Sequence, residues 1–288
     1  MSKTIRQTSE SAPQDFMFRD YLAIREPLNL EEGGRAWFRD VFDWRRPADA
    51  SAALVLGATP WMIEMLLHRQ CRQVVAVDMS ASMVQLAQGI VGKTSGNDLS
   101  KVQFHQSNWL DLSPVTSGID VVLGDNSLSF LGYPKQWSLV CDHLADRMNP
   151  NGTLITRCLS MPKRHKPLSM QEIVDTFISR SSINYTEVRA TLLFSRCNRG
   201  TYAIDTEQVL EYFESRRADL EPLFSRFPIT EDDDLLTVSK YRSSRAVYYA
   251  PPLEHVLDVI GKRFRVTDVH FGPYSMAEYF PLIVASRK

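Results

Sequence analysis

Residues 51–78, SAALVLGATPWMIEMLLHRQCRQVVAVD, constrain the fold most, because they combine a strand, a tight turn, a helix and a second strand. Residues 53–56 are an apolar run that suits a strand buried on both faces, and Gly57 ends it. A second apolar strand is expected at 73–77, with Asp78 at its carboxyl end. A βαβ unit of this kind places a nucleotide-like ligand at the turn, with the acid on its ribose hydroxyls.

The turn departs from the glycine pattern of dinucleotide-binding folds. Those folds use G-x-G-x-x-G because glycine lets the backbone approach a pyrophosphate, whereas here Gly57 is followed by Ala58, Thr59 and Pro60. Thr59 can cap the helix with its hydroxyl, and Pro60 suits the first helical position but removes an N–H that a phosphate would use. The turn therefore favours an adenosine ligand without a pyrophosphate. S-adenosylmethionine (SAM) is preferred over NAD(P), and a ligand-free structural unit is the remaining alternative.

The same strand–helix alternation continues after the first unit. Helices are expected at 79–91 and 134–148, and further strands at 102–106, 119–123 and 153–158. Strands that alternate with helices indicate a doubly wound, mainly parallel sheet with right-handed crossovers.

Polar or turn-forming residues follow four of the expected strands. They are Gly57, Asp78, Asn108 and Asp125. Because ligands of such sheets bind outside the carboxyl ends of the strands, these four residues are expected to converge on one binding edge.

Outside this core, four regions are expected. They are an N-terminal tail and helical lid (1–46), a SAM-binding α/β core (47–182), a substrate-covering insert (183–250), and a C-terminal helix with a β-hairpin that completes the sheet (251–288). The lid should contain two or three short amphipathic helices, with plain packing as the alternative role. Its polar and aromatic candidates are Tyr21, Arg25, Arg35 and Trp37.

Composition narrows the class of protein. The 288 residues are 44% hydrophobic and 23% charged with a net charge of -1, which is typical of a soluble globular protein and argues against a nucleic-acid or membrane partner. The four cysteines lack C-x-x-C spacing, so neither a metal site nor a disulfide framework is expected. Without an apolar signal segment or a membrane-length apolar run, a cytoplasmic location is expected.

With these pieces in place, the chain resembles the class I SAM-dependent methyltransferases, in a subgroup whose first motif reads L-G-x-T-P. The matching segments are LVLGATP (54–60), Asp78, Asn108 with Trp109, GDNSLSFL (124–131) and MNPNGTLITR (148–157). The resemblance covers about 50–160 and 253–288. It implies a seven-stranded Rossmann-like sheet with SAM as cofactor.

The resemblance also implies roles for individual residues. Asp78 would accept the ribose hydroxyls, with capping of the next helix as the alternative. The turn backbone would approach the methionine part of SAM, and the side chains after strands two and three would hold adenine. The cofactor-binding set is Gly57, Ala58, Thr59, Asp78, Met79, Met83, Asn108, Trp109 and Asp125. For Met79, plain packing is the alternative; for Asp125 and Asn126, a structural turn.

The expected activity is methyl transfer from SAM to an oxygen or nitrogen of a small molecule. Asp125 would hold the SAM amino group or act as a base. The expected acceptor-pocket residues are Tyr133, Tyr185, Arg196, Tyr241, Arg242 and Tyr274. Two alternatives stay open. In the first, SAM alone is the substrate, and Asp125, Asn126 and either Tyr133 or Tyr185 aim its amine for cyclisation to azetidine-2-carboxylate and methylthioadenosine. In the second, the protein binds SAM without catalysis.

Overall fold

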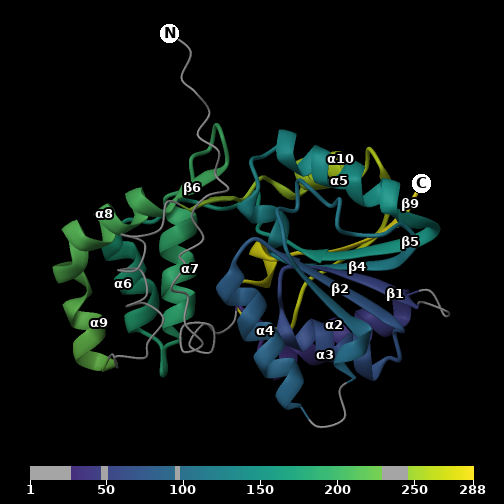
Figure 1. Cartoon of the computed structure of the whole chain (residues 1–288). Helices are drawn as coiled ribbons and strands as arrows, with labels where there is room; N and C mark the ends of the chain where they lie inside the picture. Colours follow the sequence, from purple (N-terminus) through teal and green to yellow (C-terminus); the bar gives the residue numbers. More distant parts are fainter. Residues whose placement is uncertain (1–26, 47–50, 95–97, 229–245) are drawn as a thin grey trace.

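The computed structural model describes four segments of the chain, residues 27–46, 51–94, 98–228 and 246–288. The expected lid residues Tyr21 and Arg25, and the expected pocket residues Tyr241 and Arg242, lie outside the described residues. In Figure 1 the described segments form an α/β part built on one sheet and, beside it, a helical part.

The sheet has seven strands in the order β3-β2-β1-β4-β5-β9-β8. Strands β1 to β5 run parallel, while β9 runs antiparallel to both of its neighbours, β5 and β8. This arrangement confirms the doubly wound, mainly parallel sheet expected from the sequence. The strands are β1 (Ala52–Leu56), β2 (Gln73–Asp78), β3 (Val102–Gln106), β4 (Ile119–Asp125), β5 (Met148–Arg157), β8 (Phe264–His270) and β9 (Leu282–Arg287).

Strand β1 is buried on both faces, as its unbroken apolar sequence predicts. Ala53 and Val55 belong to one hydrophobic cluster, whereas Leu54 and Leu56 belong to the cluster on the opposite face. All four side chains are at most 1% exposed. This alternation fixes the register of β1, because a shift by one residue would exchange the two sets.

Helices cover both faces of the sheet (Figure 1). One face carries α2 (Glu32–Arg45), α3 (Pro60–His68) and α4 (Ala81–Lys93), and the other carries α5 (Lys135–Arg147) and α10 (Leu253–Ile260). Ser80 caps α4 by accepting the Met83 N–H. Thr59 stands at the N-cap of α3, but its side chain makes no capping hydrogen bond, so the expected hydroxyl cap is wrong. The backbone and Pro60 alone start this helix.

The helical part has its own hydrophobic core. Its elements are α6 (Met170–Ile178), α7 (Tyr185–Ser195), α8 (Thr206–Arg216), α9 (Glu221–Arg226) and a small antiparallel pair, β6 (Ala203–Asp205) with β7 (Val247–Tyr249). Helix α6 begins with a capping box between Ser169 and Glu172. Side chains of α6 and α7 share one cluster, so the expected division between 182 and 183 runs between two helices that pack together.

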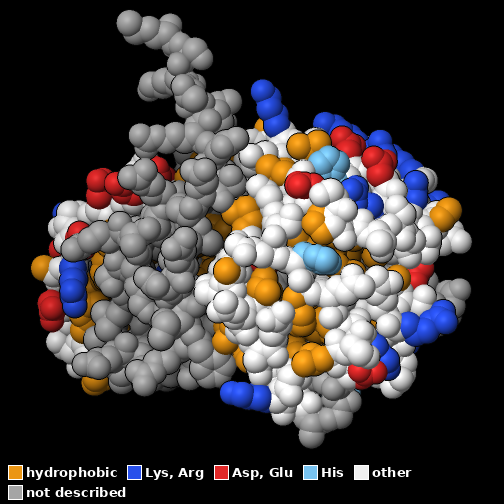
Figure 2. Space-filling model, viewed as in Figure 1, with side chains coloured by type: hydrophobic (Ala, Val, Ile, Leu, Met, Phe, Trp, Pro, Cys, Tyr) orange, Lys and Arg blue, Asp and Glu red, His pale blue; other side chains and the backbone are white. Residues whose placement is uncertain are grey.

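Shorter elements complete the described chain. They are the 3-10 helices η1 (Leu99–Lys101), η2 (Ser127–Phe130), η3 (Arg217–Leu220) and η5 (Ala277–Tyr279). The part of the expected lid that is described forms one helix, α2, preceded by a turn at 27–30. Within the described segments, no helix is both long and apolar enough to cross a membrane. On the face shown in Figure 2, charged side chains of both signs lie mainly towards the periphery of the described surface.

Replacing Gly124 with alanine is expected to lower the free energy of unfolding by about 1–3 kcal/mol. An added Cβ would lie 2.9 Å from Oγ1 of the buried Thr156 on the neighbouring strand. Gly33→Ala is the control, because its Cβ would meet nothing within 4 Å, and a helical alanine there should add about 0.5–1 kcal/mol. Urea unfolding followed by circular dichroism measures both variants. If Gly124→Ala were as stable as the wild type, the close packing of β4 on β5 would be contradicted.

Candidate functional site

The carboxyl ends of the five parallel strands meet at one edge of the sheet. The structure places Gly57 directly after β1, Asp78 at the end of β2, Asn108 two residues after β3 and Asp125 at the end of β4. Leu56 pairs with Val77 and with Gly124. The four residues expected to converge therefore do lie at the same edge.

The turn after β1 is bonded to the end of β2. Gly57 has a φ of 107°, which glycine adopts without strain, and its N–H donates to the Val77 carbonyl at 2.8 Å. The Ala58 N–H donates to Asp78 Oδ2 at 3.0 Å. The Ser127 hydroxyl donates to the Leu56 carbonyl from the opposite side. These bonds hold the turn and the Asp78 carboxylate as one unit.

Asp78 makes the contact at the entry of α4 that was considered as its alternative role. Its Oδ1 accepts the Ser80 N–H at 2.8 Å, at the entry of α4, while its Oδ2 accepts the Ala58 N–H. A carboxylate oxygen can accept more than one hydrogen bond, so both oxygens keep capacity for a ligand hydroxyl. Burial raises the pKa of Asp78, and the hydrogen bonds from Ala58 and Ser80 act in the opposite direction.

The segment after β3 forms a small turn beside this carboxylate. Asn108 Oδ1 accepts the Leu110 N–H at 2.9 Å, and the Trp109 indole donates its N–H to the Val77 carbonyl at 2.6 Å. The Trp109 ring meets Phe130 edge to face at 6.4 Å between centroids. Since its N–H is already bonded, Trp109 offers a ligand only its ring surface.

Two methionines flank Asp78 on the side of α4. The Met79 carbonyl accepts a hydrogen bond from Gln106 at 3.3 Å, and this contact links the residue after β2 to the end of β3. Met83 is partly buried against the cluster that holds α3 and α4. Both side chains belong to the expected cofactor set.

A buried ion pair lies at the other end of the edge, where β4 and β5 end. Asp125 and Arg157 face each other in register at the ends of β4 and β5, and Arg157 Nε donates to Asp125 Oδ1 at 2.5 Å. The side chains are 0% and 8% exposed for Arg157 and Asp125 respectively. Burial by itself would lower the pKa of Arg157, but Asp125 and Tyr274 outweigh it and raise that pKa above its ordinary value.

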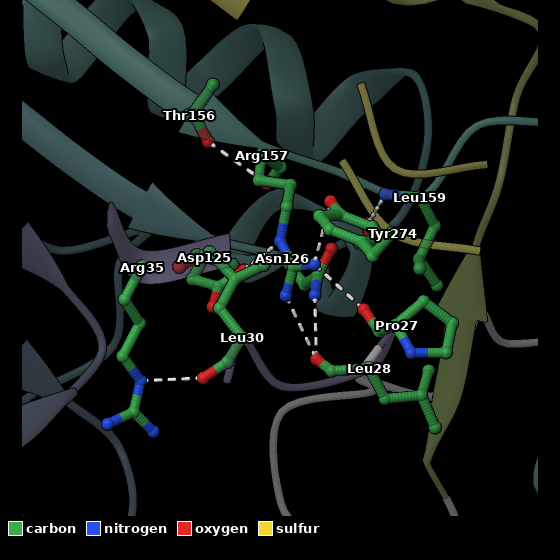
Figure 3. Close-up of polar contacts among 12 residues, drawn as sticks. Pro27, Leu28, Leu30, Arg35, Asp125, Asn126, Thr156, Arg157, Leu159 and Tyr274 are labelled. Carbon is green, nitrogen blue, oxygen red and sulfur yellow. Dashed lines mark hydrogen bonds and ion pairs between the residues drawn. The ribbon is translucent and has the colours of Figure 1, made fainter. Parts of the chain in front are cut away.

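Arg157 also holds residues 27–30 across the edge. Its Nη1 donates to the Pro27 carbonyl at 2.8 Å and to the Tyr274 hydroxyl at 3.2 Å, and its Nη2 donates to the Leu28 carbonyl at 3.1 Å. Figure 3 shows the guanidinium at the centre of these contacts. The N-terminal segment is thus fixed to the end of β5 by one side chain.

Asn126 also bonds to the segment 27–30. It has a φ of 59°, and its Nδ2 donates to the Leu28 carbonyl at 3.3 Å. Its Oδ1 is buried without a hydrogen-bond partner among the described residues. Arg35 Nε donates to the Leu30 carbonyl at 2.6 Å (Figure 3). The Asn126 amide oxygen therefore has capacity for a further hydrogen-bond donor.

The two tyrosines expected to be catalytic pack in other places. Tyr133 meets Trp137 and Tyr202 edge to face, at 5.5 and 5.8 Å between ring centroids, and burial raises its pKa. Tyr185 lies in the core of the helical part, where its hydroxyl donates to the Phe227 carbonyl at 2.5 Å. These contacts place them outside the group that surrounds Asp125.

Of the other expected pocket residues, Tyr274 reaches the edge through its bond to Arg157. The lid residue Trp37 lies against Tyr274, at 6.1 Å between ring centroids. Arg196 instead lies over Tyr212 in the helical part, 4.1 Å from the ring centroid. Sequence reasoning did not single out Arg157. A signal for it was available in the sequence, because Arg157 is a charged residue at the end of the apolar strand β5. A buried charge of this kind needs a partner.

Comparisons with known proteins find the fold in many solved structures. No protein-family profile matches the chain, and no curated protein matches its sequence. In structure, 1065 solved chains match it. A SAM-dependent methyltransferase from Methanosarcina mazei is 11% identical with a TM-score of 0.53, over 86% of this chain and 96% of that chain. A protein named as a Zn-dependent alcohol dehydrogenase from Rhodobacter sphaeroides is 14% identical with a TM-score of 0.57, over 94% and 98%.

A possible exported protein from Bordetella parapertussis is 15% identical with a TM-score of 0.49, over 88% of this chain and 66% of that longer chain. At these identities, the likeness to the methyltransferase and the dehydrogenase shows the fold alone, a Rossmann-like α/β sheet. Since proteins with methyltransferase and dehydrogenase names both match, the choice of ligand depends on the geometry of the edge.

Arg157→Met is expected to lower the free energy of unfolding by about 3–5 kcal/mol, because it leaves Asp125 buried without its counter-charge. The matched control is Arg69→Met, which breaks a 2.5 Å pair with Asp43 whose side chains are 35% and 36% exposed; we expect a loss of at most about 1 kcal/mol there.

Urea unfolding measures both variants, the single variant Asp125→Asn and the double variant Asp125→Asn/Arg157→Met. The double variant should lose less stability than the two single changes added together, since it removes both charges. A loss in Arg157→Met no larger than in Arg69→Met would contradict the structural role of the buried pair.

Proposed function

We propose that the edge formed by the ends of β1 to β5 binds SAM, and that the protein transfers the SAM methyl group to an oxygen or nitrogen of a small molecule. The observation that carries this proposal is the Asp78 carboxylate, held at the end of β2 against the turn after β1 by the Ala58 N–H. A carboxylate at this place in a doubly wound sheet accepts ribose hydroxyls.

The turn supports SAM over a dinucleotide. It carries one glycine, and Pro60 at the first turn of α3 has no N–H to offer a phosphate. The likeness to the Methanosarcina mazei methyltransferase agrees with this choice, and the L-G-x-T-P form of the turn is our basis for placing the chain in that subgroup. In this proposal Asn108 contacts the adenine edge, the Trp109 ring covers it, and Met79 and Met83 pack on its face.

The residues at the other end of the edge fit the amino acid part of SAM. The orphaned Asn126 Oδ1 and the Asp125 carboxylate are both acceptors, and a protonated amine supplies several donors. Asp125 serves better as this anchor than as a general base, because a proton on Asp125 would leave the buried Arg157 without its counter-charge.

SAM supplies a methyl group already activated by the positive sulfur. The protein then contributes mainly alignment of the acceptor and exclusion of water. The segment 27–30, fixed by Arg157 and Asn126, covers the edge where the acceptor would approach. The cyclisation alternative used Tyr133 or Tyr185 beside Asp125, and the contacts of these two tyrosines give it no support.

Product analysis by mass spectrometry tests the proposal. Incubation with SAM and a panel of phenols, amines and carboxylates should yield S-adenosylhomocysteine together with a methylated acceptor. Formation of methylthioadenosine from SAM alone would contradict the methyl-transfer proposal and support the cyclisation alternative. SAM binding without turnover across the panel would favour a non-catalytic SAM-binding protein, and calorimetry that detects no SAM binding would overturn the proposal.

Asp78→Asn is expected to weaken SAM binding by about 10–100-fold, since hydrogen bonds to a charged group contribute about 1.5–3 kcal/mol. Asp98→Asn is the control, because Asp98 lies at the start of η1, where its carboxylate bonds Ser100 and lies 3.9 Å from Lys101 Nζ. Calorimetry measures both dissociation constants. Equal affinities in the two variants would remove Asp78 from the ribose site.

SAM affinity is also expected to depend on pH through Asp78. Burial raises its pKa above the ordinary value of about 3.9. Only the ionised carboxylate accepts from both ribose hydroxyls, so affinity should fall as pH decreases toward the raised pKa, earlier than for an ordinary aspartate. Calorimetric titrations at a series of decreasing pH values should show this loss in the wild type but not in Asp78→Asn. If SAM affinity fell equally with pH in both proteins, the pH dependence would belong to another group.

A further inference from the structure

A cavity lies between the helical part and the α/β part, and its lining contains none of the edge residues described above. Its volume is about 170 Å³, and its lining comes from α6, α7, the segment after β5 and the connection between β8 and β9. An apolar cavity of about 150 Å³ is large enough to hold benzene. The space therefore fits a ligand with a single ring.

Most of the surface that lines the cavity is apolar, although polar and charged side chains such as Thr191, Arg180 and Glu187 also line it. Leu168, Phe177, Phe194 and Met276 contribute to it. The Phe194 ring lies 4.4 Å from the Tyr279 ring, at an interplanar angle of 45°. Flat aromatic walls with a flexible thioether suit an aromatic ring, because offset and edge contacts between rings are favourable.

One end of the cavity carries a polar pair. His165 Nδ1 and the Tyr279 hydroxyl share a hydrogen bond at 2.9 Å. Burial and Arg199 lower the pKa of His165, with the Phe194 backbone acting in the opposite direction, and burial with Glu278 raises the pKa of Tyr279 to about 12. The pair is therefore uncharged at neutral pH. His165 Nε2 is buried and makes no hydrogen bond of normal geometry with the described residues.

The charged groups near the cavity are already compensated or lie in solvent. Arg180 Nη1 bonds Glu187 Oε2 at 2.5 Å, and its guanidinium lies 4.3 Å from the centroid of the Phe177 ring. Lys166 is exposed. A carboxylate ligand would therefore find no buried cation without a partner among the described lining residues, and a neutral ligand is favoured.

We propose that this cavity binds a small, neutral, single-ring aromatic compound with one hydroxyl or ring N–H, which bonds to the His165–Tyr279 pair. This site goes beyond the SAM edge. The Phe280 ring centroid lies 5.8 Å from the Phe194 ring centroid and 5.4 Å from the Cζ atom of Arg157. One side-chain layer therefore separates the cavity from the buried ion pair at the edge.

Binding of 4-fluorophenol to the full chain, followed by ¹⁹F NMR without SAM, tests the proposal. The wild type should bind it, and Thr191→Leu, which adds volume to the lining, should abolish binding. Ser215→Leu is the matched control on α8, in a neighbouring surface groove that shares only Ser195 with the described lining of the cavity, and it should bind as the wild type does. Thermal unfolding and SAM calorimetry on the same variants separate loss of the cavity from loss of the fold or of the SAM site.

His165→Phe keeps a ring of similar size and removes the hydrogen bond. It should weaken 4-fluorophenol about tenfold and leave fluorobenzene binding unchanged, as expected for one hydrogen bond to a buried group. Equal weakening of both probes, binding that survives Thr191→Leu, or fluorobenzoate binding more tightly than 4-fluorophenol would overturn the proposal. Absence of 4-fluorophenol binding to the wild type would do the same, whatever the result with SAM.

Discussion

The ion pair between Asp125 and Arg157 is the contact on which the functional edge depends. It joins the ends of β4 and β5, and the same guanidinium reaches the carbonyls of Pro27 and Leu28 and the hydroxyl of Tyr274. Segments far apart in the chain thus meet at one fully buried cation. A buried charge is tolerated only when its counter-charge and hydrogen-bond partners are in place, so the edge forms as a unit.

The two ends of the edge therefore offer different chemical groups to a ligand. At the ends of β1 and β2, backbone N–H groups hold the Asp78 carboxylate and leave it acceptor capacity. At the ends of β4 and β5, a guanidinium neutralises Asp125, while Asn126 keeps an acceptor without a partner. An edge with hydroxyl-binding capacity at one end and amine-binding capacity at the other matches the ribose hydroxyls and the amino group of SAM. The cavity beside Phe194 has a mainly apolar lining surface, with the neutral His165–Tyr279 pair and the Arg180–Glu187 ion pair also at its wall, and it suits a different class of ligand.

Much of the α/β part could be predicted from the sequence, because its signals are local. The apolar runs at 53–56 and 73–77 became β1 and β2, and the C-terminal strands pair at the sheet edge as expected. Arg157, by contrast, was not predicted as a site residue, because its partners lie 32 residues away at Asp125 and 117 residues away at Tyr274. The placement of α6 with the helical part, and of Tyr133 and Tyr185 outside the edge, likewise depends on packing that no periodicity reports.

The sequence by itself determined the order of strands and helices, the one-glycine turn and the acid after β2, since these depend on local propensity and spacing. Tertiary structure decided which side chains share the edge. It paired Asp125 with Arg157 and bonded the segment 27–30 to Arg157. It also formed a cavity between parts of the chain that are distant in sequence. The physical reason is that a strand's apolar pattern is set by its own residues. A buried charge or a cavity is instead set by whatever the completed fold brings next to it.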